Sequence, residues 1–273
     1  MESASQYGFY ISSGSGAWSD YTATTASSMS WVYGYLMANT SYSVYVTAIN
    51  SNGESGPSEI EESYTGIEAP EGIEFGIIKS SVIVVKATGE MSNLGYGISG
   101  WRVEAGTGAS VGEVVGDTGW QKGSSGVEIG TELMANTRYY LRAQSRNGDG
   151  DETVYTGYIS TYTNAEVPGK AIVRNATKNS VVVILSSETK NPVYTEYSIY
   201  NETAGKYVGS SGDLTGIAVW QTYGVWGGTQ GIKNTGLSEE TVYRYKVKSR
   251  NAVGIETEWS ELSEEIETLG DVM

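Results

Sequence analysis

Three stretches of the chain alternate apolar and polar residues as a β-strand with one solvated face does. In the last of them, Tyr243, Tyr245 and Val247 alternate with Arg244, Lys246 and Lys248. The apolar positions of the other two stretches are Tyr42, Val44, Val46 and Ala48, and then Tyr139, Leu141 and Ala143. A period of two puts alternate side chains on opposite faces of a sheet. The pattern therefore predicts antiparallel sheets, and because no long window has helical spacing we expect almost no helix.

Each stretch belongs to a longer repeated phrase. The copies begin at Leu36, Leu133 and Leu237, and in every copy a tyrosine follows 6 residues later, an asparagine 14 later and a glycine 17 later. The leucines are 97 and 104 residues apart. Self-similarity at this period is typical of an array of similar domains, and three units of this size suit a chain of 273 residues.

Composition agrees with many short strands. The chain has 36 glycines, 21 tyrosines, 4 prolines and only 18% charged residues. Tyrosine favours strands, and glycine favours the tight turns between them. The composition therefore supports an all-β fold.

The tyrosine that opens each strand, six residues after a leucine, is typical of the tyrosine corner of a β-sandwich. With the asparagine and the glycine that follow, each segment resembles the E-to-F portion of fibronectin type III domains. The resemblance implies three tandem Ig-like, fibronectin type III-like β-sandwich domains, at residues 1–66, 67–164 and 165–273. Arrays of this kind occur in bacterial cell-surface and phage appendage proteins.

The resemblance is incomplete in the predicted B strands, residues 81–85 and 180–185, because neither carries the family's usual tryptophan. Tryptophans come later instead, within the glycine-rich regions 101–130 and 200–235, which we interpret as added hairpins. Flat aromatic faces pack well on sugar rings. A possible aromatic binding flank consists of Trp120, Trp220, Tyr223 and Trp226. The competing interpretation is that these side chains pack in the core or at the joints, which is the commoner fate of large aromatic residues.

The predicted final strands, residues 59–65, 157–163 and 264–268, lead into short connections. In two of them a threonine is followed five residues later by a proline, at Pro70 and Pro168. Proline fixes its own φ angle and stiffens such a connection. We therefore expect joints of restricted flexibility between the domains.

The first domain lacks its opening strands on this alignment. Pro70 precedes Leu133 by 63 residues and Pro168 precedes Leu237 by 69, but only 35 residues precede Leu36. The C strand is predicted at residues 7–11 with no A or B strand before it. Uncovering four to six inward apolar side chains forfeits ~6–18 kcal/mol, which is comparable with the stability of a whole domain.

Three explanations for the missing strands remain open. The chain is a section of a longer protein, or a neighbouring subunit supplies a strand, or the front is a reduced sandwich closed by residues 17–19. In the second case Tyr7, Phe9 and Ile11 form the assembly interface. A heterologous interface that does not close generates a filament, so this case predicts head-to-tail polymerisation.

Charge and composition exclude several kinds of chemistry. The chain has no cysteine or histidine, so thiol and imidazole catalysis are not expected. Its net charge of −15 disfavours nucleic acid as a partner, and no apolar stretch is long enough to predict membrane insertion. Catalytic residues and cofactors are therefore not predicted.

One loop resembles a calcium site. Asn147, Asp149 and Asp151 place oxygens at alternate positions, but Glu152 and Tyr158 stand where a calcium loop usually has its glycine and its bidentate glutamate. A turn between the F and G strands accounts for the same residues. We therefore expect a turn, with calcium as the alternative.

These observations predict a non-enzymatic structural subunit or spacer of an extracellular fibre or appendage. The alternative is a carbohydrate- or surface-binding adhesin module of a secreted or phage tail protein. The expected partners are further copies of the chain, in an oligomer or filament, or a polysaccharide or cell surface. The expected location is extracellular or on the cell surface, with the virion surface as the alternative.

Overall fold

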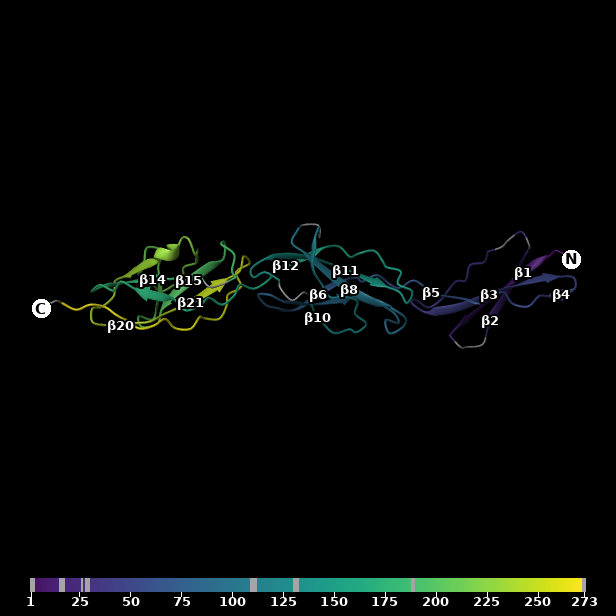
Figure 1. Cartoon of the computed structure of the whole chain (residues 1–273), viewed down its shortest axis with the longest axis horizontal. Coiled ribbons are helices and arrows are strands. Elements are labelled where there is room, and N and C mark those ends of the chain that lie inside the picture. The colour runs from purple at the N-terminus through teal and green to yellow at the C-terminus, as the bar shows by residue number, and fades with distance from the viewer. Residues whose placement is uncertain are drawn as a thin grey trace.

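The computed structural model describes residues 3–14, 18–25, 27, 30–108, 112–129, 133–187 and 190–271. Within them the fold is almost entirely β, with one short 3-10 helix, η1 (Gly228–Gln230). Every pairing between strands joins strands of the same repeat, so the sheets follow one another along the long axis of the molecule (Figure 1). The prediction of an all-β fold is confirmed.

The first repeat is a single sheet with the order β2-β1-β3-β4, with β5 also pairing β3. Its strands are β1 (Gln6–Ser13), β2 (Ser19–Thr25), β3 (Ser41–Asn50), β4 (Gly53–Glu54) and β5 (Glu61–Tyr64). Strand β1 runs antiparallel to β3, with Ile11 opposite Val44 and Phe9 opposite Val46. Among the described residues of this repeat, no second sheet covers that apolar face.

The second repeat has two sheets packed face to face. One has the order β10-β7-β6 and the other β12-β11-β8-β9. Their strands are β6 (Gly72–Ile78), β7 (Ile83–Thr88), β8 (Gly100–Gly106), β9 (Val114–Asp117), β10 (Val127–Ile129), β11 (Arg138–Arg146) and β12 (Ile159–Tyr162). Alternate residues of β7, β8 and β11 meet between the sheets, as the period of two predicts, and form a core centred on Trp101 and Leu141.

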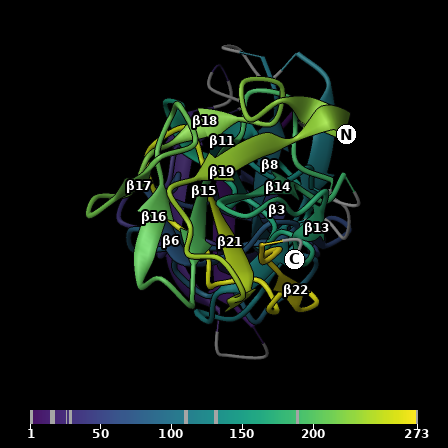
Figure 2. The same cartoon turned by 90° about the vertical axis from the view of Figure 1, so that its left-hand side faces the viewer.

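The third repeat is also layered, and Figure 2 looks along the array from this end. Its sheets have the orders β13-β14-β19, β17-β16-β15-β18 with β21 pairing β15, and β20-β22. The strands are β13 (Ile172–Arg174), β14 (Ser180–Ile184), β15 (Glu196–Asn201), β16 (Lys206–Val208), β17 (Leu214–Thr215), β18 (Gln221–Thr222), β19 (Ile232–Thr235), β20 (Val242–Tyr243), β21 (Tyr245–Arg250) and β22 (Ile266–Glu267). Strands β16 and β17 pair as a hairpin within residues 200–235.

Neither predicted B strand carries a tryptophan, but the core of the second repeat and that of the third each contain a tryptophan from another segment of the chain. Trp101 on β8 is 1% exposed and donates from Nε1 to the carbonyl of Gly123. Trp226, in the loop after β18, is also 1% exposed and donates to the carbonyl of Tyr197. A buried indole needs such a partner for its N–H. The placement of Trp226 on an exposed aromatic flank was therefore wrong, because the core of the third repeat holds its ring.

Candidate functional site: the joints between repeats

The repeated phrase forms one turn three times. Asn39, Asn136 and Glu240 occupy corresponding positions with φ of 45°, 46° and 50°. The hydroxyl of the following tyrosine accepts a hydrogen bond from a backbone N–H five residues upstream, that of Met37 (3.1 Å), Met134 (2.8 Å) or Ser238 (2.9 Å). These three bonds establish the tyrosine corner. Asparagine tolerates the left-handed conformation well, whereas glutamate seldom adopts it.

In the first joint, the side chain of Asn39 is inserted between two repeats. It is 0% exposed, and its Nδ2 donates to the carbonyls of Ser92 (3.0 Å) and Asn93 (2.8 Å). Its Oδ1 accepts the backbone N–H of Gly148 at 2.8 Å, across 109 residues of sequence. A buried amide with this many partners holds both surfaces in one relative position.

The second joint repeats this arrangement with Asn136. This side chain is also 0% exposed; Nδ2 donates to Thr195 Oγ1 at 2.8 Å, and Oδ1 accepts the backbone N–H of Ala252 at 2.7 Å. Equivalent loops accept the two side chains, because Gly148 and Ala252 each follow the asparagine that ends the repeated strand. We call these two loops, after Asn147 and after Asn251, the receiving loops. We call these two asparagines, Asn39 and Asn136, the joint asparagines.

The receiving loops return hydrogen bonds to the preceding repeat. Nδ2 of Asn147 donates to the carbonyl of Thr65 at 3.3 Å, and Nδ2 of Asn251 donates to that of Thr163 at 3.2 Å. Since each asparagine contacts the equivalent threonine of the repeat before it, the two joints share a second set of contacts.

A serine at the end of the repeated strand makes a third shared contact. The hydroxyl of Ser145 donates to the carbonyl of Glu68 at 2.6 Å, and that of Ser249 donates to the carbonyl of Glu166 at 2.7 Å. The two joints are therefore built on one plan.

The acidic residue of each connection ties it to the following repeat. The carboxylate of Glu68 accepts from the N–H (2.9 Å) and the hydroxyl (2.8 Å) of Ser92. Partial burial acts to raise the pKa of Glu68, but the hydrogen bonds, chiefly those from Ser92, outweigh it and the pKa lies below its usual value. The carboxylate of Glu166 accepts the N–H of Lys190 at 2.8 Å. These connections are therefore restrained in two ways, by the hydrogen bonds of Glu68 and Glu166 and by the buried prolines Pro70 and Pro168.

Tyr64 of β5 packs directly on the loop of the second repeat. A Cβ atom on Gly148 would overlap the ring of Tyr64, so any larger residue at this position would force the ring to move. Asp149 adds a contact, because its carboxylate accepts the N–H of Tyr64 at 2.7 Å and the hydroxyl of Ser63 at 3.0 Å.

The calcium candidates lie in this receiving loop. Oδ1 of Asn147 accepts the N–H groups of Asp149, Gly150 and Asp151, which closes a turn of the expected kind. Oδ2 of Asp151 accepts from Asn147 Nδ2 at 3.3 Å. In the part of the chain that the structure describes, no three acidic side chains gather as metal ligands would. The loop's oxygens act as acceptors for protein donors at the joint.

The other members of the predicted aromatic flank lie apart. Trp120 is half-buried between the guanidinium groups of Arg102 (4.7 Å from the ring centroid) and Arg146 (4.4 Å). Trp220 lies under Lys248 at 5.4 Å and Arg250 at 4.6 Å.

Tyr223 packs against the core of the third repeat. The four side chains therefore form no common flank. Trp120 and Trp220 instead pack against cationic side chains on the outer faces of their sheets.

The predicted assembly residues all lie on the open face of the first sheet. Tyr7 and Phe9 are half-buried and Ile11 is 7% exposed, facing the same side as Val44. The equivalents of Phe9, Ile11 and Val44 in the second repeat, namely Val103, Ala105 and Leu141, are all 0% exposed. The face thus has the apolar pattern of a sandwich core but no covering sheet among the described residues.

The segment before the first turn is also uncovered. Val32, which corresponds to the fully buried Ile129, is 86% exposed, and Trp31 is 44% exposed. Together with Ile11, Leu36 and other side chains they line a groove of roughly 380 Å³. Ala17 lies outside the described residues, and Trp18 packs edge-on against Tyr45 at 4.5 Å, on the opposite face, so Trp18 does not close the sandwich.

The joint asparagines are the residues of this candidate site that the sequence did not predict. They are part of the repeated phrase, but the phrase was interpreted only as a mark of the repeat. One signal was present: the third copy has Glu240 where the first two have asparagine. A residue shared by the first two copies and replaced in the third is a reason to examine its contacts.

No protein-family model matches the chain, and no curated protein matches its sequence. Among solved structures it is similar to a segment of two fibronectin type III domains from chicken tenascin, with a TM-score of 0.47 and 15% identity over 74% of this chain and 100% of that one. It is also similar to the FN1–FN3 domains of chicken CNTN1, with a TM-score of 0.32 and 14% identity over 98% of this chain and 89% of that one.

In the described part of the chain, no helix is long and apolar enough to span a bilayer.

Proposed function

We propose that the protein is a non-enzymatic structural spacer of an extracellular fibre or appendage, located outside the cell or on its surface, with a virion surface as the alternative. The observation that carries the proposal is the pair of equivalent joints. Asn39 and Asn136 are fully buried, and in each the amide nitrogen and the amide oxygen are both hydrogen-bonded to the following repeat. A flexible tether would have no use for such contacts, whereas a spacer that sets a distance depends on them.

Small-angle X-ray scattering in solution tests this proposal. A spacer with restrained joints gives one extended pair-distance distribution that does not change with ionic strength, because the joint contacts are buried and screened little by salt. A flexible array gives a broad distribution whose maximum dimension changes with conditions. That result would contradict the spacer function.

We further propose that a strand from a neighbouring subunit completes the first sandwich, and that copies join head to tail in this way. The open face supports the proposal, because its apolar residues match positions that are fully buried in the second repeat. Strand β7 shows the chemistry that such a donor needs: Ile83, Val85 and Ala87 alternate toward the core, and Ile83 pairs with Ile129. Because Val32 corresponds to Ile129, the segment around Val32 is the edge with which a donated strand would pair.

A peptide with the sequence of residues 79–89 tests this completion. It is expected to bind the whole chain and to protect the amides of β1 and β3 from hydrogen exchange, since a bound strand covers the sheet. A control peptide with aspartate in place of the three inward residues of β7 is expected not to bind. Equal protection by both peptides, or no protection by either, would contradict completion by a donated strand.

A second candidate function is binding to a carbohydrate or a cell surface, as in an adhesin module. Its support is no longer the predicted aromatic flank but a hollow at the first joint, where side chains of two repeats meet around an uncharged surface. The two candidates are compatible, because a spacer can carry a binding site.

A further inference from the structure

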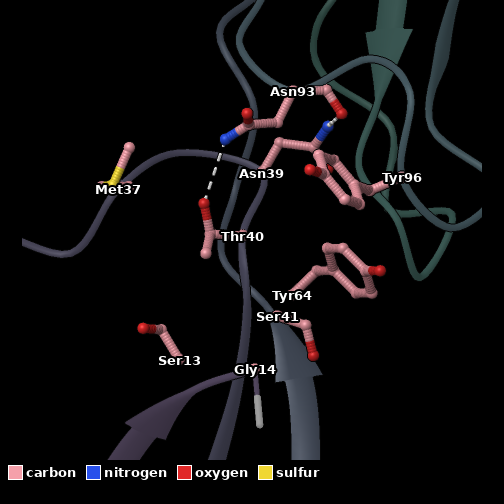
Figure 3. A pocket seen from close by; sticks show the side chains of 9 residues that line it. All are labelled: Ser13, Gly14, Met37, Asn39, Thr40, Ser41, Tyr64, Asn93 and Tyr96. Carbon is pink, nitrogen blue, oxygen red and sulfur yellow. Dashed lines mark hydrogen bonds between the residues drawn. The ribbon is translucent and has the colours of Figure 1, made fainter. Parts of the chain in front are cut away.

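The first joint borders an open hollow of roughly 330 Å³. Figure 3 shows its lining: the end of β1, the repeated turn, the end of β5 and the loop before β8. The residues that line it are Ser13, Gly14, Met37, Asn39, Thr40, Ser41, Tyr64, Asn93 and Tyr96. Its volume is at the lower end of the range for small-molecule sites, enough for one or two sugar rings.

Two tyrosines from different repeats give the hollow flat apolar surfaces. Tyr64 comes from the first repeat and Tyr96 from the second, and in Figure 3 their rings lie toward the same side, with Met37 on the other. Tyr96 is 63% exposed, and Tyr64 rests on Gly148, which holds its ring in place. Rigid aromatic faces at low cost in conformational entropy are well suited to pack against a pyranose ring.

The hollow also has hydroxyl groups available. Among the described residues, the hydroxyls of Ser13, Ser41, Tyr64 and Tyr96 have no hydrogen-bond partner. By contrast, Nδ2 of Asn93 donates to the carbonyl of Ala38 at 3.0 Å and to Thr40 Oγ1 at 3.1 Å. The asparagine thus fixes the wall, while the hydroxyls can donate to and accept from a ligand's own hydroxyls.

The uncharged lining of the hollow and the negative net charge of the chain disfavour anionic ligands. None of the nine lining residues is charged, and the chain as a whole has a net charge of −15. An anionic ligand would find no cation in the hollow and an unfavourable field around it. A purely apolar ligand would leave the hydroxyl groups without partners, which is costly when they lose water.

The corresponding region of the second joint is built differently. There Tyr194 donates its hydroxyl to the carbonyl of Asn136 at 2.8 Å, so this tyrosine is used to close the joint. The neighbouring hollow is lined by Glu196 and Arg250, which are paired with each other. The two joints share their framework but differ in whether an aromatic, uncharged surface is left open.

We propose that the hollow at the first joint binds a neutral saccharide, with a sugar ring packed against Tyr96 and Tyr64 and its hydroxyls bonded to Ser13 and Ser41. The inference deepens the second candidate function and does not depend on the spacer role. Because the site is formed by two repeats, its ligand also bridges the joint and restrains it further.

The test uses the whole chain with four neutral hexasaccharides as probes, namely cellohexaose, xylohexaose, mannohexaose and chitohexaose. Titrations are followed by amide chemical shifts and by calorimetry. We expect at least one probe to bind and to shift the amides of Ser41 and Tyr96. Tyr96→Ala is expected to weaken that binding at least tenfold, whereas Tyr158→Ala, an exposed tyrosine outside the hollow, leaves it unchanged.

Several results would overturn the proposal. These are no binding of any neutral probe, shifts confined to another surface, or equal binding by Tyr96→Ala. Tighter binding of an anionic alginate hexamer or of benzyl alcohol would also overturn it, because either would assign the hollow to another ligand class. Thermal unfolding of each variant establishes that the fold is retained. Scattering of the unliganded chain reports the spacer role separately, so failure of one proposal is distinguishable from failure of the other.

Discussion

The joint asparagines give the sharpest quantitative test of the proposed spacer. The substitution Asn39→Gly keeps the left-handed backbone that this position needs, since glycine adopts positive φ freely. It removes the three side-chain hydrogen bonds to Ser92, Asn93 and Gly148. At 0.5–1.5 kcal/mol for each bond, about 1.5–4.5 kcal/mol of docking free energy is lost.

That loss is large enough to observe directly. Every 1.4 kcal/mol shifts the equilibrium between docked and undocked repeats tenfold, so the expected change is roughly 10-fold to 1000-fold. Because the chain has no cysteine, spin labels can be attached at Glu59→Cys and Ser125→Cys without removing any native thiol. Pulsed electron spin resonance is expected to give one narrow distance distribution for the parent chain and a broadened one for Asn39→Gly.

Glu240→Gly is the matched control. It makes the same exchange to glycine at the corresponding turn, where φ is 50°, but away from both described joints. It is expected to leave the distribution between the first two repeats unchanged. If Asn39→Gly stays as narrow as the parent chain, the hydrogen bonds do not set the geometry of the joint, and the reasoning is refuted.

Three further predictions concern the open face, the outer face of the third repeat and the first connection. Val32→Asp is expected to lower the free energy of unfolding by less than ~1 kcal/mol, because Val32 is 86% exposed. Ile129→Asp, at the corresponding position with 0% exposure, is expected to unfold the second repeat. Urea unfolding measures both variants, and an equal loss of stability in the two would contradict an uncovered face in the first repeat. Trp259→Ala is expected to cost about 1–3 kcal/mol, since two lysine ammonium groups lie 4.8 and 5.1 Å from its ring, and a thermal unfolding curve identical to the parent's would argue against a cation–π contribution. The pKa of Glu68 is lower in the folded chain than its usual value of 4.5, so Glu68 stabilises the first joint above pH 4.5, and this stabilisation is lost as the pH falls through the folded-state pKa. The first joint is therefore expected to loosen in acid, and Glu68→Gln is expected to abolish that pH dependence of the spin-label distances. A pH dependence that persists in Glu68→Gln would assign the effect to another group.

Local signals predicted much of the fold. The alternation in residues 42–48, 139–143 and 243–247 gave strands and their inward faces because side-chain direction in a strand follows position alone. The tyrosine corner was predictable because its hydrogen bond spans five residues. Trp226 was misplaced because a glycine-rich loop has no periodicity, so only the packing of its neighbours decides whether the ring faces solvent or the core.

The candidate site was less predictable from local signals. Trp120 and Trp220 were predicted to share a binding flank, but each ring instead packs against arginine or lysine side chains that lie on other strands of its own repeat. The loop at Asn147 was expected to be a turn, and it is one, yet its role in receiving Asn39 involves a residue from another repeat.

The sequence by itself determined the repeat and the strand faces, since both follow from spacing and alternation along the chain. Only the tertiary structure decided how the repeats meet. Asn39 reaches Gly148 across 109 residues and Asn136 reaches Ala252 across 116, and such contacts exist only once whole sheets have formed and been placed end to end. The physical reason is that a buried side chain is satisfied by whatever donors and acceptors folding brings to it, and sequence separation carries no information about that distance.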